Sequence, residues 1–307
     1  VSTLAKSGLP VSHVARLVSH LNDALLRRIL TWAEGDLGPP PCRYAFLALG
    51  SEGRHEQTLL TDQDNALVYA DGVPEAAAYF EALAGKAIAD LVAAGFPPCP
   101  GGYMATRWSG PLSAWKERFA GWIDEPRADA VLAAGIFFDH RAAAGTLDVS
   151  PLAEVVSRAR GNAPFLSHLA RAAVGFRPPI GAFRRLKPED GGIDLKRGGL
   201  APVQGLARVW ALDAGVAATG TLERLDGAAS AGLIDRARAE DLSEAYLYLA
   251  GLRLRAQLAA LGEGTPPGNR IGADSLSPSE RRHLKQAFLA IRDAQEATVT
   301  RYHVTLS

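Results

Sequence analysis

The sequence FLALGSEGRHEQTLLTDQDNALVY, residues 46–69, decides how the fold of this chain is interpreted. It begins and ends with an apolar run, and between the runs lie a Gly-Ser pair, ten further residues and two aspartates separated by one residue. Short apolar runs bounded by turn residues are typical of buried β-strands. The stretch therefore predicts a strand over residues 44–49, a glycine turn that leads into a helix, and a second strand over residues 66–69.

Gly50 and Ser51 lie at the predicted end of the first strand. The start of a helix leaves backbone N–H groups without an acceptor, and such groups can bind a phosphate. Glycine lets the backbone approach the anion closely, and the serine hydroxyl adds another hydrogen-bonding group. We therefore expect Gly50 and Ser51 to bind nucleotide phosphates.

Asp62 and Asp64 lie two positions apart at the start of the second predicted strand. Side chains alternate along a strand, so both carboxylates leave from one face, with Cα atoms about 6 to 7 Å apart. Two carboxylates this close repel each other, and a divalent cation bound between them relieves the repulsion. The pair predicts a Mg²⁺ or Mn²⁺ site, and the alternative is an ordinary solvated turn.

Composition limits the classes of protein that fit. The 307 residues can form two domains, and Lys plus Arg (33) equal Asp plus Glu (33), which disfavours nucleic acid as a partner. No apolar run is long enough to span a membrane. Cys42 and Cys99 cannot form a disulfide framework and lack zinc spacing, so we expect a cytoplasmic protein and a Cys99 thiol that is merely packed in its loop.

The pattern of the chain changes near residue 150. A lead-in helix is expected within residues 1–34, followed by a mixed α and β segment over 35–150 and a helical segment over 151–307. A third strand is expected over 103–108. Helices are expected over 74–94, 112–123, 127–144, 152–159, 164–174, 201–218, 238–261 and 279–304, the last one with a capping box formed by Ser277 and Glu280.

The motifs GSEGRHEQ and TDQDNALVY together resemble the polymerase-β-like nucleotidyltransferase superfamily. The likeness is greatest to a bacterial family described as putative nucleotidyltransferases, which follow cyclic-nucleotide-binding and CBS domains. It is more distant to glutamine synthetase adenylyltransferase and to the uridylyltransferase of nitrogen signalling. Residues 193–212 and 284–295 also look like the helical C-terminal part of that bacterial family. Because the chain begins with Val1, we expect a regulatory domain upstream.

The resemblance implies an α+β fold, with a small nucleotidyltransferase domain containing a mixed sheet, followed by an α-helical bundle. Gly50 and Ser51 match the turn that grips the triphosphate, and Asp62 and Asp64 match the metal-binding pair. Arg54 follows Ser51 by three residues, and we expect it to neutralise phosphate charge, the alternative being a surface arginine.

The superfamily commonly supplies a third acid from a later strand, but GGYMATRW, the strand expected here, carries none. Asp139 and Asp194 are the candidates to replace it. Asp194 precedes Lys196 in a basic, glycine-rich segment, which we expect to be a flexible loop folded over the cleft. Lys196 would then meet the triphosphate, and Asp194 would supply the acid or orient Lys196. The alternative is a salt bridge between the domains.

These features predict metal-dependent transfer of a nucleoside monophosphate from an NTP to an acceptor hydroxyl. The relatives that look closest in mechanism modify a tyrosine of a partner protein, which implies a protein acceptor and a role in signal transduction. Two alternatives remain open. One is a regulatory nucleotide sensor that has lost the chemistry, and the other is a helical docking module for which the α/β part is only scaffold.

Three tryptophans, Trp108, Trp115 and Trp122, recur at intervals of seven residues. This spacing would place them on one side of a helix. Large aromatic side chains at such spacing are more often packed in a core than exposed for binding. We therefore expect the three rings to pack in the core or between the domains.

Overall fold

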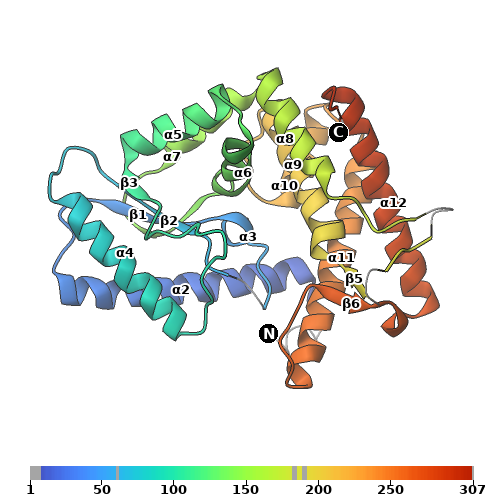
Figure 1. The fold of residues 1–307 in the computed structure, drawn as a ribbon, viewed down its shortest axis with the longest axis horizontal. Helices are drawn as coiled ribbons and strands as arrows, with labels where there is room; N and C mark the ends of the chain where they lie inside the picture. The colour runs from blue at the N-terminus through green and yellow to red at the C-terminus, as the bar shows by residue number, and fades with distance from the viewer. Residues whose placement is uncertain (1–7, 60–61, 182–184, 189–191, 306–307) are drawn as a thin grey trace. The chain divides into compact units, whose positions relative to one another are not determined.

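The computed structural model describes residues 8–59, 62–181, 185–188 and 192–305 (Figure 1). The chain packs as two compact units. The first, called here the α/β unit, comprises Ala15–Asp124 and Ala133–Arg158, and the second, the helical unit, comprises Val1–Val14, Glu125–Leu132 and Ala159–Ser307. No helix in the described ranges is long and apolar enough to cross a membrane. The fold is α+β, as the sequence predicted.

A four-stranded mixed sheet forms the centre of the α/β unit, in the order β3-β2-β1-β4. Strand β1 pairs antiparallel with both β2 and β4, whereas β2 and β3 run parallel. Every residue of β1 and β2 is buried, which explains why these two strands appear in the sequence as continuous apolar runs. The strands are β1 (Tyr44–Ala48), β2 (Asn65–Tyr69), β3 (Ser109–Pro111) and β4 (Arg141–Gly145).

Helices cover both faces of this sheet. Figure 1 shows α2 and α4 on one side of it and α5 and α7 on the other. The apolar faces of α2 and α4 enclose a core with β1 and β2 that includes Ile29, Phe46, Leu67 and Phe80. The helices are α2 (Val11–Leu37), α3 (Gly50–Gly53), α4 (Ala76–Ala93), α5 (Leu112–Asp124), α6 (Ala128–Phe137) and α7 (Ser150–Val156), followed by the 3₁₀ turn η1 (Ser157–Ala159).

An aromatic cluster fills the other side of the sheet. Trp108 packs against Trp115, Trp122 and Phe137. The indole N–H of Trp115 donates to the carbonyl oxygen of Leu67 in β2 at 3.2 Å. The three rings pack together as predicted, but only Trp115 is fully buried, whereas Trp108 and Trp122 are half-buried, and only Trp115 and Trp122 lie on a helix, α5.

The prediction of one helix over residues 127–144 is wrong, because α6 ends at Phe137 and β4 begins at Arg141. The alanines of β4 are compatible with a helix or a strand, and this segment forms a strand because it pairs with β1. Gly145 ends the strand at φ +88°, and a Cβ there would lie 2.1 Å from the carbonyl oxygen of Tyr44. The close approach of β4 to β1 therefore requires glycine at this position.

The prediction of a strand over residues 103–108 is also wrong. This segment forms a turn in which the carbonyl oxygen of Met104 accepts hydrogen bonds from the backbone N–H groups of Arg107 and Trp108, both at 2.9 Å. The Asn65 side chain holds the turn by accepting from the N–H of Ala105 at 2.7 Å. Strand β3 begins only at Ser109.

In the part of the helical unit that the structure describes, helices α8–α12 pack together with a short hairpin. The helices are α8 (Ala163–Gly175), α9 (Ala201–Ala214), α10 (Thr221–Ser230), α11 (Arg236–Gly262) and α12 (Pro278–Arg301). The hairpin pairs β5 (Gly192–Asp194) with β6 (Arg270–Gly272), and η4 (Ala273–Ser275) follows it. The predicted capping box of α12 is confirmed, since Ser277 and Glu280 exchange both side-chain-to-backbone hydrogen bonds.

A π-helical turn, η3 (Lys196–Leu200), leads directly into α9. The prediction of a flexible loop here is wrong, because Gly198 and Gly199 are both buried. A Cβ on Gly198 would lie 2.7 Å from Pro179, and one on Gly199 would lie 2.7 Å from Leu249. The two glycines therefore allow close packing of the turn and do not provide mobility.

Candidate metal and nucleotide site

The turn after β1 brings the glycine motif next to the aspartates. The backbone N–H of Leu49 donates to the carbonyl oxygen of Asp64 at 2.9 Å, which joins the end of β1 to the start of β2. Gly50 has φ +53°, and a Cβ there would lie 3.2 Å from a carboxylate oxygen of Asp64. Glycine thus provides both the left-handed backbone and room for the carboxylate. Ser51, half-buried, follows in the single helical turn α3.

Gly53 fixes the other end of α3. A Cβ at Gly53 would lie 1.7 Å from the carbonyl oxygen of Asp139, in the turn between α6 and β4. Since a real Cβ cannot approach an oxygen so closely, only glycine allows this packing. The turn α3 is therefore held against two parts of the α/β unit, the start of β2 and the α6–β4 turn.

Asp62, Asp64 and Cys99 form a group of potential metal ligands. One carboxylate oxygen from each aspartate and the Cys99 sulfur all lie within 4.8 Å of one another. The aspartates are half-buried and the cysteine is buried. Two oxygens and a sulfur at this spacing fit a divalent cation, and the sulfur adds affinity for the softer ions such as Zn²⁺.

The loop that carries Cys99 is aligned with the aspartates by backbone pairing. The N–H of Gln63 donates to the carbonyl oxygen of Pro97 at 3.1 Å, and its side-chain amide donates to that of Phe96 at 2.9 Å. The N–H of Asn65 donates to the carbonyl oxygen of Tyr103 at 2.9 Å. These bonds hold the loop along residues 63–65, which places the thiol beside the carboxylates.

Cys99 was expected to be a packed loop thiol, and the structure adds its position in the ligand group. Burial, followed by a hydrogen bond with Asp64, raises the pKa of the thiol. A bound cation has the opposite effect, because it stabilises the thiolate. No local pattern in the sequence indicates this contact, because Cys99 is distant from Asp64 along the chain and only the pairing of two loops brings them together.

Glu52 is a further acid at this site, and the sequence did not single it out. It lines a cavity of about 20 Å³ together with Asp62 and Asn22. Burial raises the pKa of Glu52 to about 7, with a smaller contribution from the negative charge of Asp23, while Arg141 opposes the shift. The signal that could have identified Glu52 is its place in the GSEG motif, directly after the Gly-Ser pair.

Arg54 is buried and bonded to two carboxylates of the protein. Its guanidinium donates to Asp139 at 2.5 Å and to Glu56 at 2.7 Å. Asp139 is fully buried, and the ligand group found among the described residues does not include it. The pair joins the segment after α3 to the α6–β4 turn. Contact of Arg54 with phosphate and a catalytic role for Asp139 stay predictions, and in the structure the two side chains are bonded to each other.

Arg141 holds α2 next to the same turn. Its guanidinium makes two hydrogen bonds with the buried carboxylate of Asp23 in α2, at 2.7 and 3.0 Å, and a third to the carbonyl oxygen of Glu52 at 3.3 Å. A bidentate arginine–carboxylate pair fixes orientation as well as distance. Arg141 therefore fixes the backbone of Glu52.

Asp194 and Lys196 belong to the helical unit. Asp194 ends β5, and its carboxylate accepts a hydrogen bond from the backbone N–H of Arg197 at 2.7 Å. Lys196 is exposed at the first position of η3. Their expected approach to the nucleotide and to Asp62 and Asp64 stays a prediction.

The mixed sheet and its carboxylate pair are consistent with a nucleotidyltransferase. Two family models match the chain: Putative nucleotidyltransferase DUF294 over residues 1–129, and Putative nucleotidyltransferase substrate binding domain over residues 163–302. No curated protein matches it. The two models together cover most of the sequence, and both matched regions belong to the family described as putative nucleotidyltransferases. The matches indicate transfer of a nucleoside monophosphate as the general class of reaction.

Proposed function

We propose that this protein transfers a nucleoside monophosphate from an NTP to an acceptor hydroxyl, with a divalent cation held by Asp62, Asp64 and Cys99. The observation that carries the proposal is the position of Gly50 beside Asp64. A Cβ on Gly50 would lie 3.2 Å from a carboxylate oxygen of Asp64, so the absence of a side chain leaves room for that carboxylate. A phosphate-binding turn and a pair of potential metal ligands thus occupy one place. Mg²⁺ and Mn²⁺ are the ions suggested by the carboxylates, while the thiol favours the softer of the two.

A bound cation would neutralise charge on the triphosphate and on the pyrophosphate leaving group. The residues of the chain then bind and orient the substrate. Ser51 and the N–H groups at the start of α3 donate hydrogen bonds to the terminal phosphates, and Asp62 and Asp64 hold the cation. Catalysis of this kind depends on positioning and on charges fixed in advance, because the protein forms no covalent bond to the nucleotide.

Glu52 is proposed as the general base, whose carboxylate accepts the proton of the acceptor hydroxyl. It lines the same cavity as Asp62, and its pKa of about 7 suits proton transfer near neutral pH. Asp139 is less suited to this role, because its carboxylate is fully buried against Arg54. The proposal therefore places the third acid on the glycine turn and not on a later strand. A tyrosine or another hydroxyl of a partner protein is the proposed acceptor, following the resemblance to enzymes that modify proteins.

The alternative function is that of a nucleotide sensor without transfer activity. The observation that favours it is the ligand group itself, which among the described residues contains two carboxylates and a thiol and no third carboxylate. Both functions require the NTP to bind. They differ in whether label from the α-phosphate reaches an acceptor.

The test is to incubate the full chain with each α-labelled NTP, Mg²⁺ or Mn²⁺ and a lysate of the source organism. We expect a labelled protein band that is lost with Asp62→Asn/Asp64→Asn, while the melting temperature in the absence of metal shows that the variant is folded. Metal-dependent NTP binding without any labelled band would support the sensor. Unchanged NTP binding by the folded double variant would overturn both functions.

A further inference from the structure

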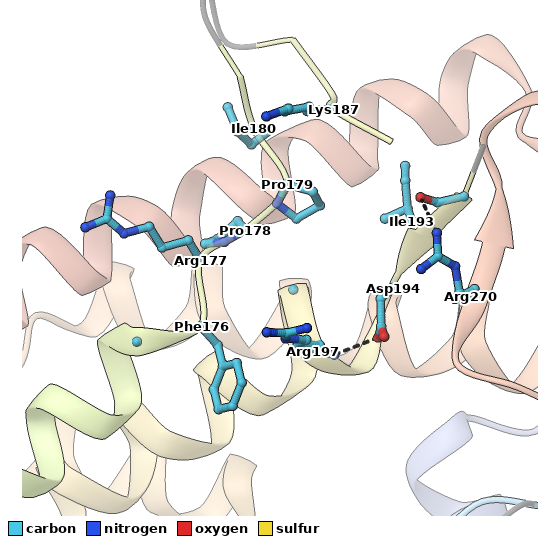
Figure 2. Close-up of a pocket in the computed structure, with 13 residues that line it drawn as sticks. Phe176, Arg177, Pro178, Pro179, Ile180, Lys187, Ile193, Asp194, Arg197 and Arg270 are labelled. Carbon is cyan, nitrogen blue, oxygen red and sulfur yellow. Dashed lines mark hydrogen bonds between the residues drawn. The ribbon is translucent and has the colours of Figure 1, made fainter. Parts of the chain in front are cut away.

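The helical unit has a pocket of its own, with a volume of about 360 Å³ (Figure 2). Its walls come from the segment after α8, the strand β5, the turn η3 and the first residue of β6. Backbone pairing fixes part of the wall, since the N–H of Lys187 donates to the carbonyl oxygen of Pro179 at 2.8 Å. The pocket is large enough for a small organic molecule.

The charged side chains around this pocket are mostly cationic. Four cations line it, Arg177, Lys187, Arg197 and Arg270, against one carboxylate, that of Asp194. The whole chain carries equal numbers of acidic and basic residues, so the excess here is local. The Asp194 carboxylate accepts a hydrogen bond from the backbone N–H of Arg197. Within the part of the chain that the structure describes, no carboxylate lies within 4.0 Å of the Arg177, Lys187 or Arg197 head groups.

Arg197 is an exposed residue that lines the pocket beside an aromatic ring. It lies on the π-helical turn η3, and its guanidinium carbon lies 5.8 Å from the centre of the Phe176 ring. Figure 2 shows Arg197 between Phe176 and Asp194. Contact with an aromatic ring restricts the rotamers of an arginine without neutralising its charge. Irregular π-helical turns within helices are also frequent at functional sites.

Apolar side chains complete the lining. Phe176 is 44% exposed, and Pro179, Ile180 and Ile193 also face the pocket. A pocket that combines a cationic group of this size with an apolar wall fits a ligand with a phosphate at one end and an organic group at the other. Arginine forks match the oxygens of a phosphate especially well.

We propose that this pocket binds a phosphate-bearing small molecule, with Arg197 and Lys187 on the phosphate oxygens and Phe176 against the organic part. None of the residues that line this pocket belongs to the proposed metal site, so binding of the phosphate-bearing molecule requires neither Asp62 nor Asp64. It gives the helical unit a ligand of defined chemistry, which the transfer reaction alone does not supply.

The test uses inorganic pyrophosphate as the probe and isothermal calorimetry on the full chain in EDTA, so that no metal site contributes. Arg197→Ala and Lys187→Ala should each weaken binding by about tenfold, since each removes a charge-assisted hydrogen bond. Arg197→Lys should recover part of the loss. Arg282→Ala, an exposed arginine of α12 that does not line the pocket, should bind as the parent does.

The metal-site variant Asp62→Asn/Asp64→Asn should bind metal-free pyrophosphate with the affinity of the parent, which separates the two sites. In this variant, displacement of pyrophosphate by ATP would identify nucleotide phosphates as the source of the ligand, and failure of ATP to compete would identify another phosphate-bearing compound. The proposal is overturned if the parent does not bind pyrophosphate, or if folded Arg197→Ala and Lys187→Ala proteins bind it equally well. Absence of nucleotidyl transfer would contradict the proposed function but not the proposed phosphate pocket.

Discussion

At the scale of single residues, Glu52 connects the stability of the protein to pH. Its pKa is raised from 4.5 to about 7, so between these values the folded protein keeps a proton that the unfolded chain has released. The contribution of Glu52 to stability is therefore greatest below pH 4.5 and falls as pH rises towards 7 and above. Burial is the main cause of the raised pKa, and the negative charge of Asp23 adds to it. The positive charge of Arg141 opposes only part of the shift.

Glu52→Gln should remove this dependence. In EDTA at pH 8 we expect the variant to be more stable than the parent by roughly 1 to 3 kcal/mol, at about 1.4 kcal/mol for each pKa unit. At pH 4 the two proteins should be equally stable, because both then carry a neutral side chain. Urea unfolding at the two pH values measures the difference. The same difference at pH 4 and pH 8 would contradict the raised pKa.

Cys99 should decide which cations the metal site prefers. If its sulfur is a ligand, Cys99→Ser should weaken Co²⁺ or Zn²⁺ binding by about tenfold or more and change Mg²⁺ binding little, because thiolate favours the softer ions. Calorimetry gives the affinities, and Co²⁺ bound to the parent should show a thiolate-to-metal charge-transfer band that the variant lacks. Equal losses for Mg²⁺ and Zn²⁺ would indicate that the variant disturbs the aspartates, and an unchanged Co²⁺ spectrum would exclude the sulfur as a ligand.

At the scale of elements, the turn α3 depends on the absence of a side chain at Gly53. Gly53→Ala would place a Cβ 1.7 Å from the carbonyl oxygen of Asp139, so we expect a loss of about 3 kcal/mol or more in the free energy of unfolding. Gly121→Ala on α5 is the matched control, because no atom lies within 4 Å of its added Cβ.

The control variant should be as stable as the parent or more stable by up to about 1 kcal/mol, as expected for an exposed helical glycine replaced by alanine. Denaturant unfolding of both variants measures the contrast. If Gly53→Ala costs no more than Gly121→Ala, then α3 does not pack against the α6–β4 turn as described.

The elements that could be predicted from the sequence are those whose signals are local. Strands β1 and β2 are buried throughout and appear as short apolar runs, and the capping box of α12 lies within four consecutive residues, 277–280. Strand β4 could not be recognised, because Ala142–Ala144 fits helix or strand equally and pairing with β1 decides. Burial of Gly198 and Gly199 likewise depends on partners distant in the sequence, Pro179 and Leu249.

The same distinction applies to the candidate site. Gly50, Asp62 and Asp64 could be singled out because their spacing along one segment carries the chemistry. Cys99 reaches the aspartates only through the backbone pairing of two loops, which has no counterpart in a local pattern. Glu52 lies within the motif, but its raised pKa depends on Asp23 and Arg141 from distant segments.

At the scale of the whole molecule, each unit has a ligand of its own in these proposals. Mn²⁺ at 100 times its dissociation constant should stabilise the α/β unit by about 2.7 kcal/mol, and pyrophosphate in EDTA should stabilise the helical unit in the same way. Scanning calorimetry should therefore show that Mn²⁺ raises the melting temperature of the parent but not that of Asp62→Asn/Asp64→Asn. Pyrophosphate should raise that of both proteins, and at the same concentration it should raise that of Arg197→Ala less, because this variant binds it about tenfold more weakly. A Mn²⁺ effect that persists in the double variant would contradict the assignment.

The tryptophans are divided unequally between the two units, which provides an optical means to follow each one. Four of the five, Trp32, Trp108, Trp115 and Trp122, belong to the α/β unit, and Trp210, 2% exposed in α9, is the single one of the helical unit. Trp210→Phe therefore yields a protein whose indole fluorescence comes from the α/β unit alone. Subtracting its emission during unfolding from that of the parent isolates the signal of Trp210, so that the melting of each unit can be followed in an unlabelled protein.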